Sequence, residues 1–339
     1  MDIVGKNLQE LEEFMLANDQ SKFRAKQVYN WIYLKSVSTY DEMTDLPLQT
    51  RELLKEKTNL CSISIKDKQV SKDGTMKFLF ELKDGCFAEA VLMRFDNRAN
   101  LTACISTQVG CPMGCTFCAT AKLGFKRNLD VDEIIQQIFL IQADTGLKVT
   151  NIVYMGQGEP LLNFDNLLGS IKIFREQFQI GARRITVSTC GIIPQINKLA
   201  DLDFQSTLAI SLHAPNQTVR QEIMPIAKKY EFDELLSCLK KYTEKTGRRV
   251  TVEYVLMKDV NDSIEAAKEL AYAIAKLKSN VNLIVYNQNE KSPYKKPNKE
   301  NVLKFKYILE ASGKKVTVRL ERGADIDAAC GQLASKAKQ

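Results

Sequence analysis

The pattern of apolar and polar positions changes twice along this chain of 339 residues. Up to about residue 60, apolar residues recur at three- and four-residue spacings, as in LQELEEFMLAN and FRAKQVYNWIYLK, which predicts a small helical module. From about 62 to 95 apolar and polar positions alternate, with turn signals at Lys72-Asp73-Gly74 and Lys83-Asp84-Gly85. This second region predicts a short antiparallel sheet.

Beyond about residue 100, short apolar runs rich in β-branched residues alternate with helical patterns. The expected strands are LTACISTQ, TNIVYMG, RRITVST, STLAISLH, RVTVEYVLM and VNLIVYN, with KKVTVRLE as a last strand. The expected helices span 130–145, 164–178, 192–201, 217–246, 262–278 and 299–312, and Asp130 with Glu133 forms a capping box at the start of the first. Six β-α units in succession predict an α/β protein with a partial (β/α)6 barrel.

These changes divide the chain into three predicted parts: 1–60, a helical accessory domain that is a candidate for RNA binding; 61–98, a β-strand extension; and 99–335, the catalytic barrel. The net charge of +7 is compatible with a nucleic-acid substrate but does not indicate one by itself. The first residues include acids and lack a long apolar run, so we expect neither a signal peptide nor a membrane span, and a cytoplasmic protein.

Nine cysteines in a reducing compartment favour metal-binding or catalytic thiols over a disulfide scaffold. Three of them, Cys111, Cys115 and Cys118, form a CxxxCxxC loop directly after the first barrel strand. One interpretation is a zinc site whose fourth ligand is another cysteine or the single histidine. The other is a [4Fe-4S] cluster in which the three thiolates bind three irons and the fourth iron is left open.

Glycines and small polar residues follow the other barrel strands, at the ends where barrel enzymes place their chemistry. The stretches are Gly156-Gln157-Gly158-Glu159-Pro160, Ser188-Thr189-Cys190-Gly191, Ser211-Leu212-His213-Ala214-Pro215, and Asn287 after the sixth strand. Each is weak alone, because the glycines could form a turn, Ser188 could cap a helix and His213 could be a packed structural residue. Their collective position at one rim is the stronger indication.

The cysteine triplet, with Phe117 before its third member, resembles the signature of the radical S-adenosylmethionine (SAM) superfamily. The chain as a whole resembles the adenine-C2 RNA methyltransferases of that superfamily, the RlmN/Cfr family. The matching segments are FRAKQVYNWIY, CISTQVGCPMGCTFCATAKLGFKRNL, GQGEPLLN, RRITVSTCGIIP, LAISLHAPN, MPI, VEYVLMKDVND and GADIDAACGQLA. The resemblance covers essentially the whole chain, and its motifs are highly specific.

The resemblance implies a [4Fe-4S] cluster on Cys111, Cys115 and Cys118, with SAM on its open iron. The SAM contacts that it implies are Gly158, Glu159, Ser188, Ser211, Leu212, His213 and Asn287. Two departures concern loop geometry: Gln157 replaces the Met of many relatives, and Val285 and Gln288 flank Asn287 where prolines are common.

The resemblance also implies a reaction that uses two SAM molecules. One methylates the Cys330 thiolate, and the other yields a 5′-deoxyadenosyl radical that activates this methyl group for addition to carbon 2 of adenine. Glu89 is the implied proton acceptor, although its place in an alternating strand also suits a solvent-facing residue. Cys104 then releases the methylated RNA by forming a Cys104–Cys330 disulfide.

The implied substrates are an adenosine of 23S rRNA and one in the tRNA anticodon loop, and the implied electron donor is a flavodoxin- or ferredoxin-type reductant. We expect a monomer. Lys122, Lys126 and Arg127, after the cysteine loop, are candidate phosphate contacts. Three alternatives stay open. The first is methylation of carbon 8, which Pro160-Leu161-Leu162-Asn163 disfavours. The second is radical SAM chemistry on another substrate, and the third is a zinc-stabilised RNA-binding protein without catalysis.

Overall fold

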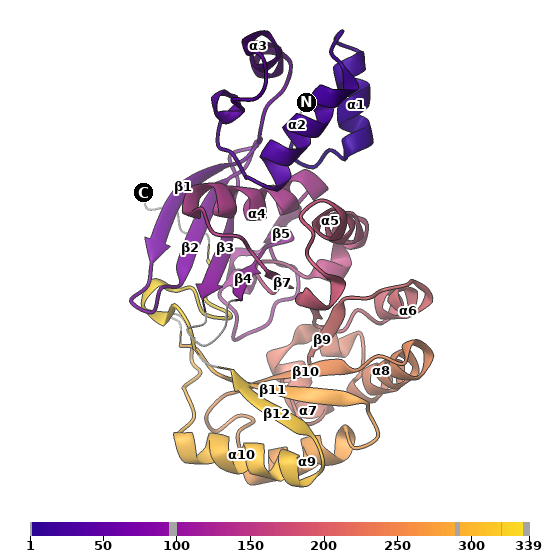
Figure 1. Ribbon diagram of the computed structural model, residues 1–339. Helices are drawn as coiled ribbons and strands as arrows, with labels where there is room; N and C mark the ends of the chain where they lie inside the picture. The colour runs from indigo at the N-terminus through magenta and orange to yellow at the C-terminus, as the bar shows by residue number, and fades with distance from the viewer. Residues whose placement is uncertain (1, 95–99, 289–291, 320, 335–339) are drawn as a thin grey trace.

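The computed structural model describes residues 2–94, 100–288, 292–319 and 321–334 (Figure 1). The chain begins with the helices α1 (Leu8–Leu16), α2 (Lys22–Tyr33) and α3 (Leu48–Lys57), which stand together at one end of the molecule. The ring of Tyr33 joins them to the rest, because it packs on Phe178 with 5.2 Å between centroids; its hydroxyl accepts a hydrogen bond from the Gly5 amide (2.8 Å) within the helical module. The predicted helical start of the chain is therefore present.

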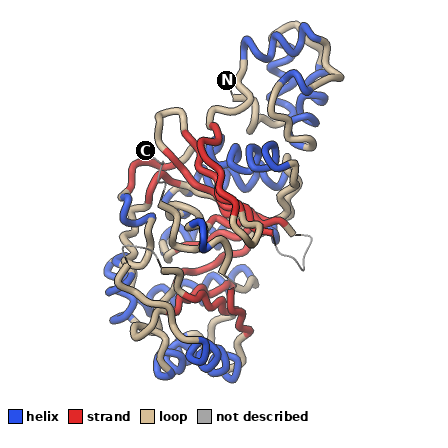
Figure 2. Tube along the Cα trace, turned by 90° about the vertical axis from the view of Figure 1, so that its left-hand side faces the viewer, coloured by secondary structure: helices blue, strands red, loops and turns tan. Residues whose placement is uncertain are grey.

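Ten strands form one continuous sheet, seen in side view in Figure 2. In spatial order they are β1 (Ser64–Val70), β2 (Met76–Glu81), β3 (Phe87–Arg94), β4 (Leu101–Cys104), β7 (Asn151–Tyr154), β8 (Ile185–Thr189), β9 (Thr207–Ser211), β10 (Val250–Leu256), β11 (Ser279–Val285) and β12 (Lys315–Arg319). Neighbours from β4 to β12 are parallel, whereas β1 to β4 are antiparallel. The predicted antiparallel extension is thus the edge of the barrel sheet, since β3 pairs directly with β4.

Helices connect the parallel strands, and Figure 1 places α5, α6 and α8 along one side of the sheet. Their bounds are α4 (Val131–Thr145), α5 (Phe164–Glu176), α6 (Ile193–Asp201), α7 (Gln217–Ile223), α8 (Phe232–Thr246), α9 (Ile264–Ala273) and α10 (Lys299–Ala311). The capping box of Asp130 and Glu133 at the start of α4 is confirmed. The single helix expected over 217–246 is wrong: it breaks at Pro225, which has no N–H to donate.

A separate hairpin, β5 (Gln108–Gly110) and β6 (Phe125–Asn128), encloses the cysteine loop. Arg127 of β6 forms ion pairs of 2.7 Å with Asp84, in the turn before β3, and with Glu133 of α4. These carboxylates hold the guanidinium in a structural role, so phosphate binding by Arg127 would require breaking both pairs. Arg127 thereby fixes the hairpin, and with it the cysteine loop, to the barrel.

The segment after β12 returns across the molecule and is fixed at two places. Its first part meets the β1–β2 turn, where the Ser71 hydroxyl donates to Asp325 (2.5 Å) and the Gly323 amide donates to Asp73 (3.1 Å). Its second part meets the cysteine loop, where the Ala119 amide donates to the Gly331 carbonyl (2.8 Å). The antiparallel edge of the sheet therefore supports the C-terminal segment.

None of the helices in the described part of the chain combines the length and the apolar character of a membrane span.

Gly110 and Gly124 form a matched pair for testing the hairpin. Both have positive φ, +74° and +72°, but a Cβ on Gly110 would lie 1.8 Å from the Gly124 carbonyl oxygen, whereas a Cβ on Gly124 would meet nothing within 4 Å. Gly124 has φ +72° and ψ −174°, a conformation that is essentially restricted to glycine, so Gly124→Ala should cost only this backbone strain, about 1–3 kcal/mol. We expect Gly110→Ala to lower the Tm of thermal unfolding at least twice as far, and equal losses would contradict this packing.

Candidate active site

The carboxyl ends of the parallel strands open onto a cavity whose empty space, including the open solvent at its mouth, is about 950 Å³. Its lining includes Cys111, Cys115, Cys118, Gly158, Glu159, Ser188, Ser211, His213, Asn287 and Cys330. The residues that the sequence places after the barrel strands therefore line one cavity together. Leu212 is the exception among the expected SAM contacts: its side chain is fully buried in the core and it is not among the described lining residues.

The three cysteines of the loop face this cavity from different positions. None of them forms a disulfide, and burial raises the pKa of Cys111 to about 12 and that of Cys115 further. In the described ranges, no three Cys, His, Asp or Glu side chains converge closely enough to hold one metal ion. A tetrahedral zinc ion would require sulfurs about 4 Å apart. Three thiols that line one cavity form the ligand set of a [4Fe-4S] cluster in which each thiolate binds a different iron.

The Gly158-Glu159 turn presents a carboxylate that the backbone has already oriented. Glu159 is buried; its Oε2 accepts from the Cys190 amide (2.8 Å) and its Oε1 accepts from the Leu161 amide (3.0 Å). A Cβ on Gly158 would lie 2.7 Å from the Gln108 side chain, so glycine is required there. Burial raises the pKa of Glu159, and the carboxylate faces the cavity as an acceptor for a cationic group.

Polar groups on neighbouring strands complete the wall. The hydroxyls of Ser188, at the end of β8, and Ser211, at the end of β9, lie 3.4 Å apart. Asn287 donates from Nδ2 to the Cys330 carbonyl (3.3 Å), while its buried Oδ1 has no hydrogen-bond partner among the described residues. An unpartnered buried acceptor in a cavity wall is suited to receive a donor from a bound ligand.

His213 is held neutral in the same wall. Its Nδ1 accepts from the Val255 amide (3.1 Å), which places the ring proton on Nε2. The ring meets Phe117 of the cysteine loop edge to face, with 5.2 Å between centroids. Burial lowers the pKa of His213 to about 3.

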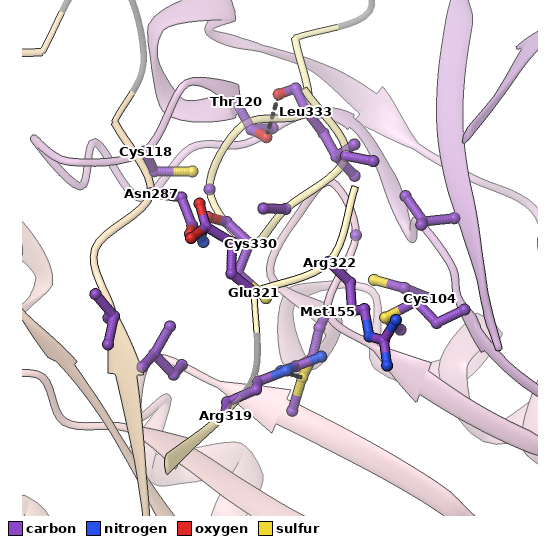
Figure 3. Close-up of a pocket in the computed structure, with 18 residues that line it drawn as sticks. Cys104, Cys118, Thr120, Met155, Asn287, Arg319, Glu321, Arg322, Cys330 and Leu333 are labelled. Carbon is purple, nitrogen blue, oxygen red and sulfur yellow. Dashed lines mark hydrogen bonds between the residues drawn. The ribbon is translucent and has the colours of Figure 1, made fainter. Parts of the chain in front are cut away.

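A second pocket, of about 720 Å³, adjoins the first and brings Cys104 and Cys330 together (Figure 3). Cys104 ends β4, and Cys330 comes from the C-terminal segment. Burial raises the pKa of the Cys104 thiol to about 12, with a further contribution from Cys330. The two pockets share Cys118, Met155, Gly156, Ile284, Asn287, Arg319, Cys330 and Gly331. The thiol pair and the three-cysteine loop therefore belong to one continuous site.

Arg319 was missed by sequence reasoning. It ends β12 and lines both pockets, with its Nη1 3.3 Å from the Met155 sulfur. The neighbouring Cys330 thiol, and then Glu253, raise the pKa of Arg319. The sequence did contain an indication of its role, because Arg319 lies near the end of the last predicted strand, where the other polar residues of the site also follow their strands.

Glu89 lies in β3 and is 3% exposed, so its interpretation as a solvent-facing residue is wrong. Its carboxylate is 3.7 Å from the Lys77 amine, and its Oε2 accepts from Gln157 Nε2 at 3.5 Å. Gln157, noted as a departure from relatives, is thus a partner of Glu89. Glu89 itself is not among the described residues that line either pocket.

His213 is the only histidine of the chain, so its protonation can be measured without overlap. Because its pKa is lowered to about 3, between pH 6.5 and 3 only the unfolded chain takes up this proton. Below pH 6.5 this residue therefore lowers the free energy of unfolding as pH falls, by about 1.4 kcal/mol per pH unit. NMR of the ring nitrogens in the metal-free protein should show the neutral Nε2–H form at pH 5, and titration near pH 6.5 would contradict the burial.

Comparison with known proteins places this site in a family. Residues 105–271 match the radical SAM superfamily, and residues 1–60 match a ribosomal RNA large subunit methyltransferase N-terminal domain. A probable dual-specificity RNA methyltransferase RlmN of Alkaliphilus oremlandii is 48% identical over 339 residues, 99% of this chain and 98% of the relative. A protein of the same name from Thermotoga neapolitana is 48% identical and covers 94% of this chain and 92% of its own length.

The crystal structure of a radical SAM methyltransferase from Sphaerobacter thermophilus is 41% identical, with a TM-score of 0.93 over 99% of this chain and 100% of that chain. This similarity confirms the predicted radical SAM α/β fold. Members of the radical SAM superfamily carry a [4Fe-4S] cluster and use SAM, which agrees with the three thiols and the adjoining cavity. The chain therefore belongs to the RlmN family of radical SAM RNA methyltransferases.

Proposed function

We propose that this enzyme methylates carbon 2 of an adenosine in 23S rRNA and of an adenosine in tRNA. The two RNA classes follow the name of its relatives, the dual-specificity RNA methyltransferases RlmN. Carbon 2 follows the resemblance to the adenine-C2 group, including Pro160-Leu161-Leu162-Asn163. The observation that carries the proposal is that Cys104 and Cys330 both line one pocket, which adjoins the three-cysteine loop.

The cavity residues have the chemistry to hold both cofactors. Cys111, Cys115 and Cys118 would each bind one iron of the cluster. Glu159 would accept hydrogen bonds from the SAM ammonium group, and the free Oδ1 of Asn287 offers a second acceptor. The remaining contacts in this proposal are Gly158, Ser188, Ser211, Leu212 and His213, with Leu212 limited to its backbone because its side chain is buried.

Cys330 is the proposed carrier of the methyl group. Its thiolate attacks the methyl carbon of one SAM molecule; the new bond joins this carbon to the Cys330 sulfur, the carbon–sulfur bond of SAM breaks, and S-adenosylhomocysteine leaves. Arg319 places a positive charge beside this sulfur, as a thiolate requires. When bound, the cluster and a second SAM would supply a 5′-deoxyadenosyl radical for the removal of a hydrogen atom from this methyl group, and an acceptor for the one electron that the adduct must lose.

The Cys330 methylene carbon bonds to adenine carbon 2 and links protein to RNA. Glu89 is the proposed acceptor of the carbon-2 proton. Its support is its position: Val91, two residues along the same strand, lines the pocket and pairs with Cys104 in the sheet. Cys104 then attacks the Cys330 sulfur, the carbon–sulfur bond breaks, and the released carbon takes up a proton to become the methyl group. A dithiol or thioredoxin-type reductant reduces the resulting disulfide.

RNA binding by residues 1–60, as an accessory domain before the extension and the barrel, is part of the same proposal. We further propose a flavodoxin- or ferredoxin-type electron donor. The basic composition of the chain suits an RNA substrate, whose affinity depends on phosphate contacts.

Cys330→Ala should abolish both protein S-methylation and 2-methyladenosine formation, because no other thiol at this position can carry the methyl group. Mass spectrometry of the protein and of nuclease-digested RNA measures both. The control is Cys238→Ala: Cys238 is buried in α8, outside the described lining of both pockets. Normal 2-methyladenosine from the Cys330 variant would refute the proposal.

Cys104→Ala should have the opposite signature. Methyl transfer to Cys330 and addition to adenine remain possible, but release does not, so a covalent protein–RNA adduct should accumulate. Denaturing electrophoresis with labelled RNA detects the adduct, and peptide mapping should place it on Cys330. Full turnover without an adduct would show that Cys104 is not the resolving thiol.

A further inference from the structure

A buried cation lies behind the cysteine loop, outside the cavity. Arg220, in α7, is completely buried. Its Nη2 donates to the Cys190 carbonyl (2.6 Å), but its Nε and Nη1 have no hydrogen-bond partner among the described residues. A guanidinium stays charged at neutral pH, and a buried charge without compensation is strongly destabilising. The position of this charge therefore requires an explanation.

Arg220 interacts electrostatically with two thiols and with the ring of His213, whose pKa it helps to lower. Burial lowers the pKa of the guanidinium, and the Cys190 and Cys115 thiols offset part of this shift. Within the described parts of the chain, no carboxylate forms an ion pair with Arg220. Among the described residues, the groups beside this cation that can become anionic are therefore two thiols, Cys190 and, in the cysteine loop, Cys115.

The segment that carries Arg220 is packed against the loop. The Thr116 amide donates to the Ile223 carbonyl at 3.0 Å, and a Cβ on Gly114 would lie 3.5 Å from the Pro225 ring. Met224, between these two contacts, lines the cavity. The end of α7 thus forms the floor under the loop, with Arg220 one turn behind it.

We propose that Arg220 is the buried counter-ion of the iron–sulfur cluster and raises its reduction potential. This inference rests on the proposed cluster site at Cys111, Cys115 and Cys118. A [4Fe-4S] centre bound by three thiolates carries one net negative charge when oxidised and two when reduced. A fixed cation in a low-dielectric interior stabilises the state with more negative charge to a greater extent. Arg220 therefore eases the uptake of the electron that the reaction requires.

The competing explanation is structural. The bond from Nη2 to the Cys190 carbonyl joins α7 to the loop after β8, and an arginine retained only for this bond would have no effect on the potential. Two variants separate the effect of charge from that of shape. Arg220→Lys retains the positive charge, whereas Arg220→Met replaces it with an uncharged, apolar side chain of similar length. Arg175→Met, at an exposed position of α5, removes an equal charge far from the loop.

The test is a dithionite titration of the cluster-loaded, full-length protein, with the reduced cluster followed by electron paramagnetic resonance. At the wild-type midpoint, Arg220→Met should have a ratio of reduced to oxidised cluster about tenfold lower, which is about 59 mV for a one-electron couple. Arg220→Lys should stay closer to the wild type than Arg220→Met, and Arg175→Met should not differ from it. If Arg220→Met does not fold, Arg220→Gln replaces it with the same expectation.

The outcomes separate this inference from the proposed function. Wild-type protein that binds no iron and sulfide would refute the cluster site itself. A wild-type cluster together with an unchanged or higher potential in the charge-free variant would refute only the role of Arg220. A shift of the same size in Arg220→Lys and Arg220→Met would assign the effect to packing and would equally overturn the counter-ion.

Discussion

The site depends on the attachment of the C-terminal segment to the cysteine loop. The Ala119 amide binds the Gly331 carbonyl at 2.8 Å, and the Thr120 hydroxyl donates to the Leu333 carbonyl at 2.7 Å. Both bonds are made by residues that directly follow Cys330, and they fix this part of the chain beside the loop (Figure 3). Without these two hydrogen bonds, the C-terminal segment would not be held at the rim of the barrel. Cys330, the proposed methyl carrier, would then not lie next to the cavity.

The remaining architecture supports that attachment from both sides. The antiparallel edge of the sheet holds the first part of the segment through Asp73 and Asp325, and it also carries Glu89 into the interior. Arg127 fixes the hairpin around the cysteine loop through two carboxylates. The antiparallel strands β1 to β3, which the sequence predicts only as an extension, therefore support the site. That site combines Cys104, near the start of the barrel domain, with Cys330, near its end.

Local patterns in the sequence were sufficient for the barrel, because strand periodicity and strand ends need no long-range information. Long-range partners were not visible. The contact of Gln157 with Glu89 joins the loop after β7 to β3, a pairing without a sequence signature. Arg220 was invisible for the same reason: a charged helical residue predicts exposure, and only packing shows that it is buried. The break at Pro225, by contrast, had a local signal that the single helix expected over 217–246 overlooked.

The proposed thiol chemistry predicts how hydrogen atoms are distributed in the product. With SAM that carries a fully deuterated methyl group, one deuterium should leave with 5′-deoxyadenosine, because Cys330 gives up one hydrogen before the carbon–carbon bond forms. The 2-methyladenosine should then retain the other two, with the third position filled by solvent hydrogen. Mass spectrometry of both products measures this directly. A product that retains all three deuterium atoms would show direct methyl transfer and contradict the role of Cys330.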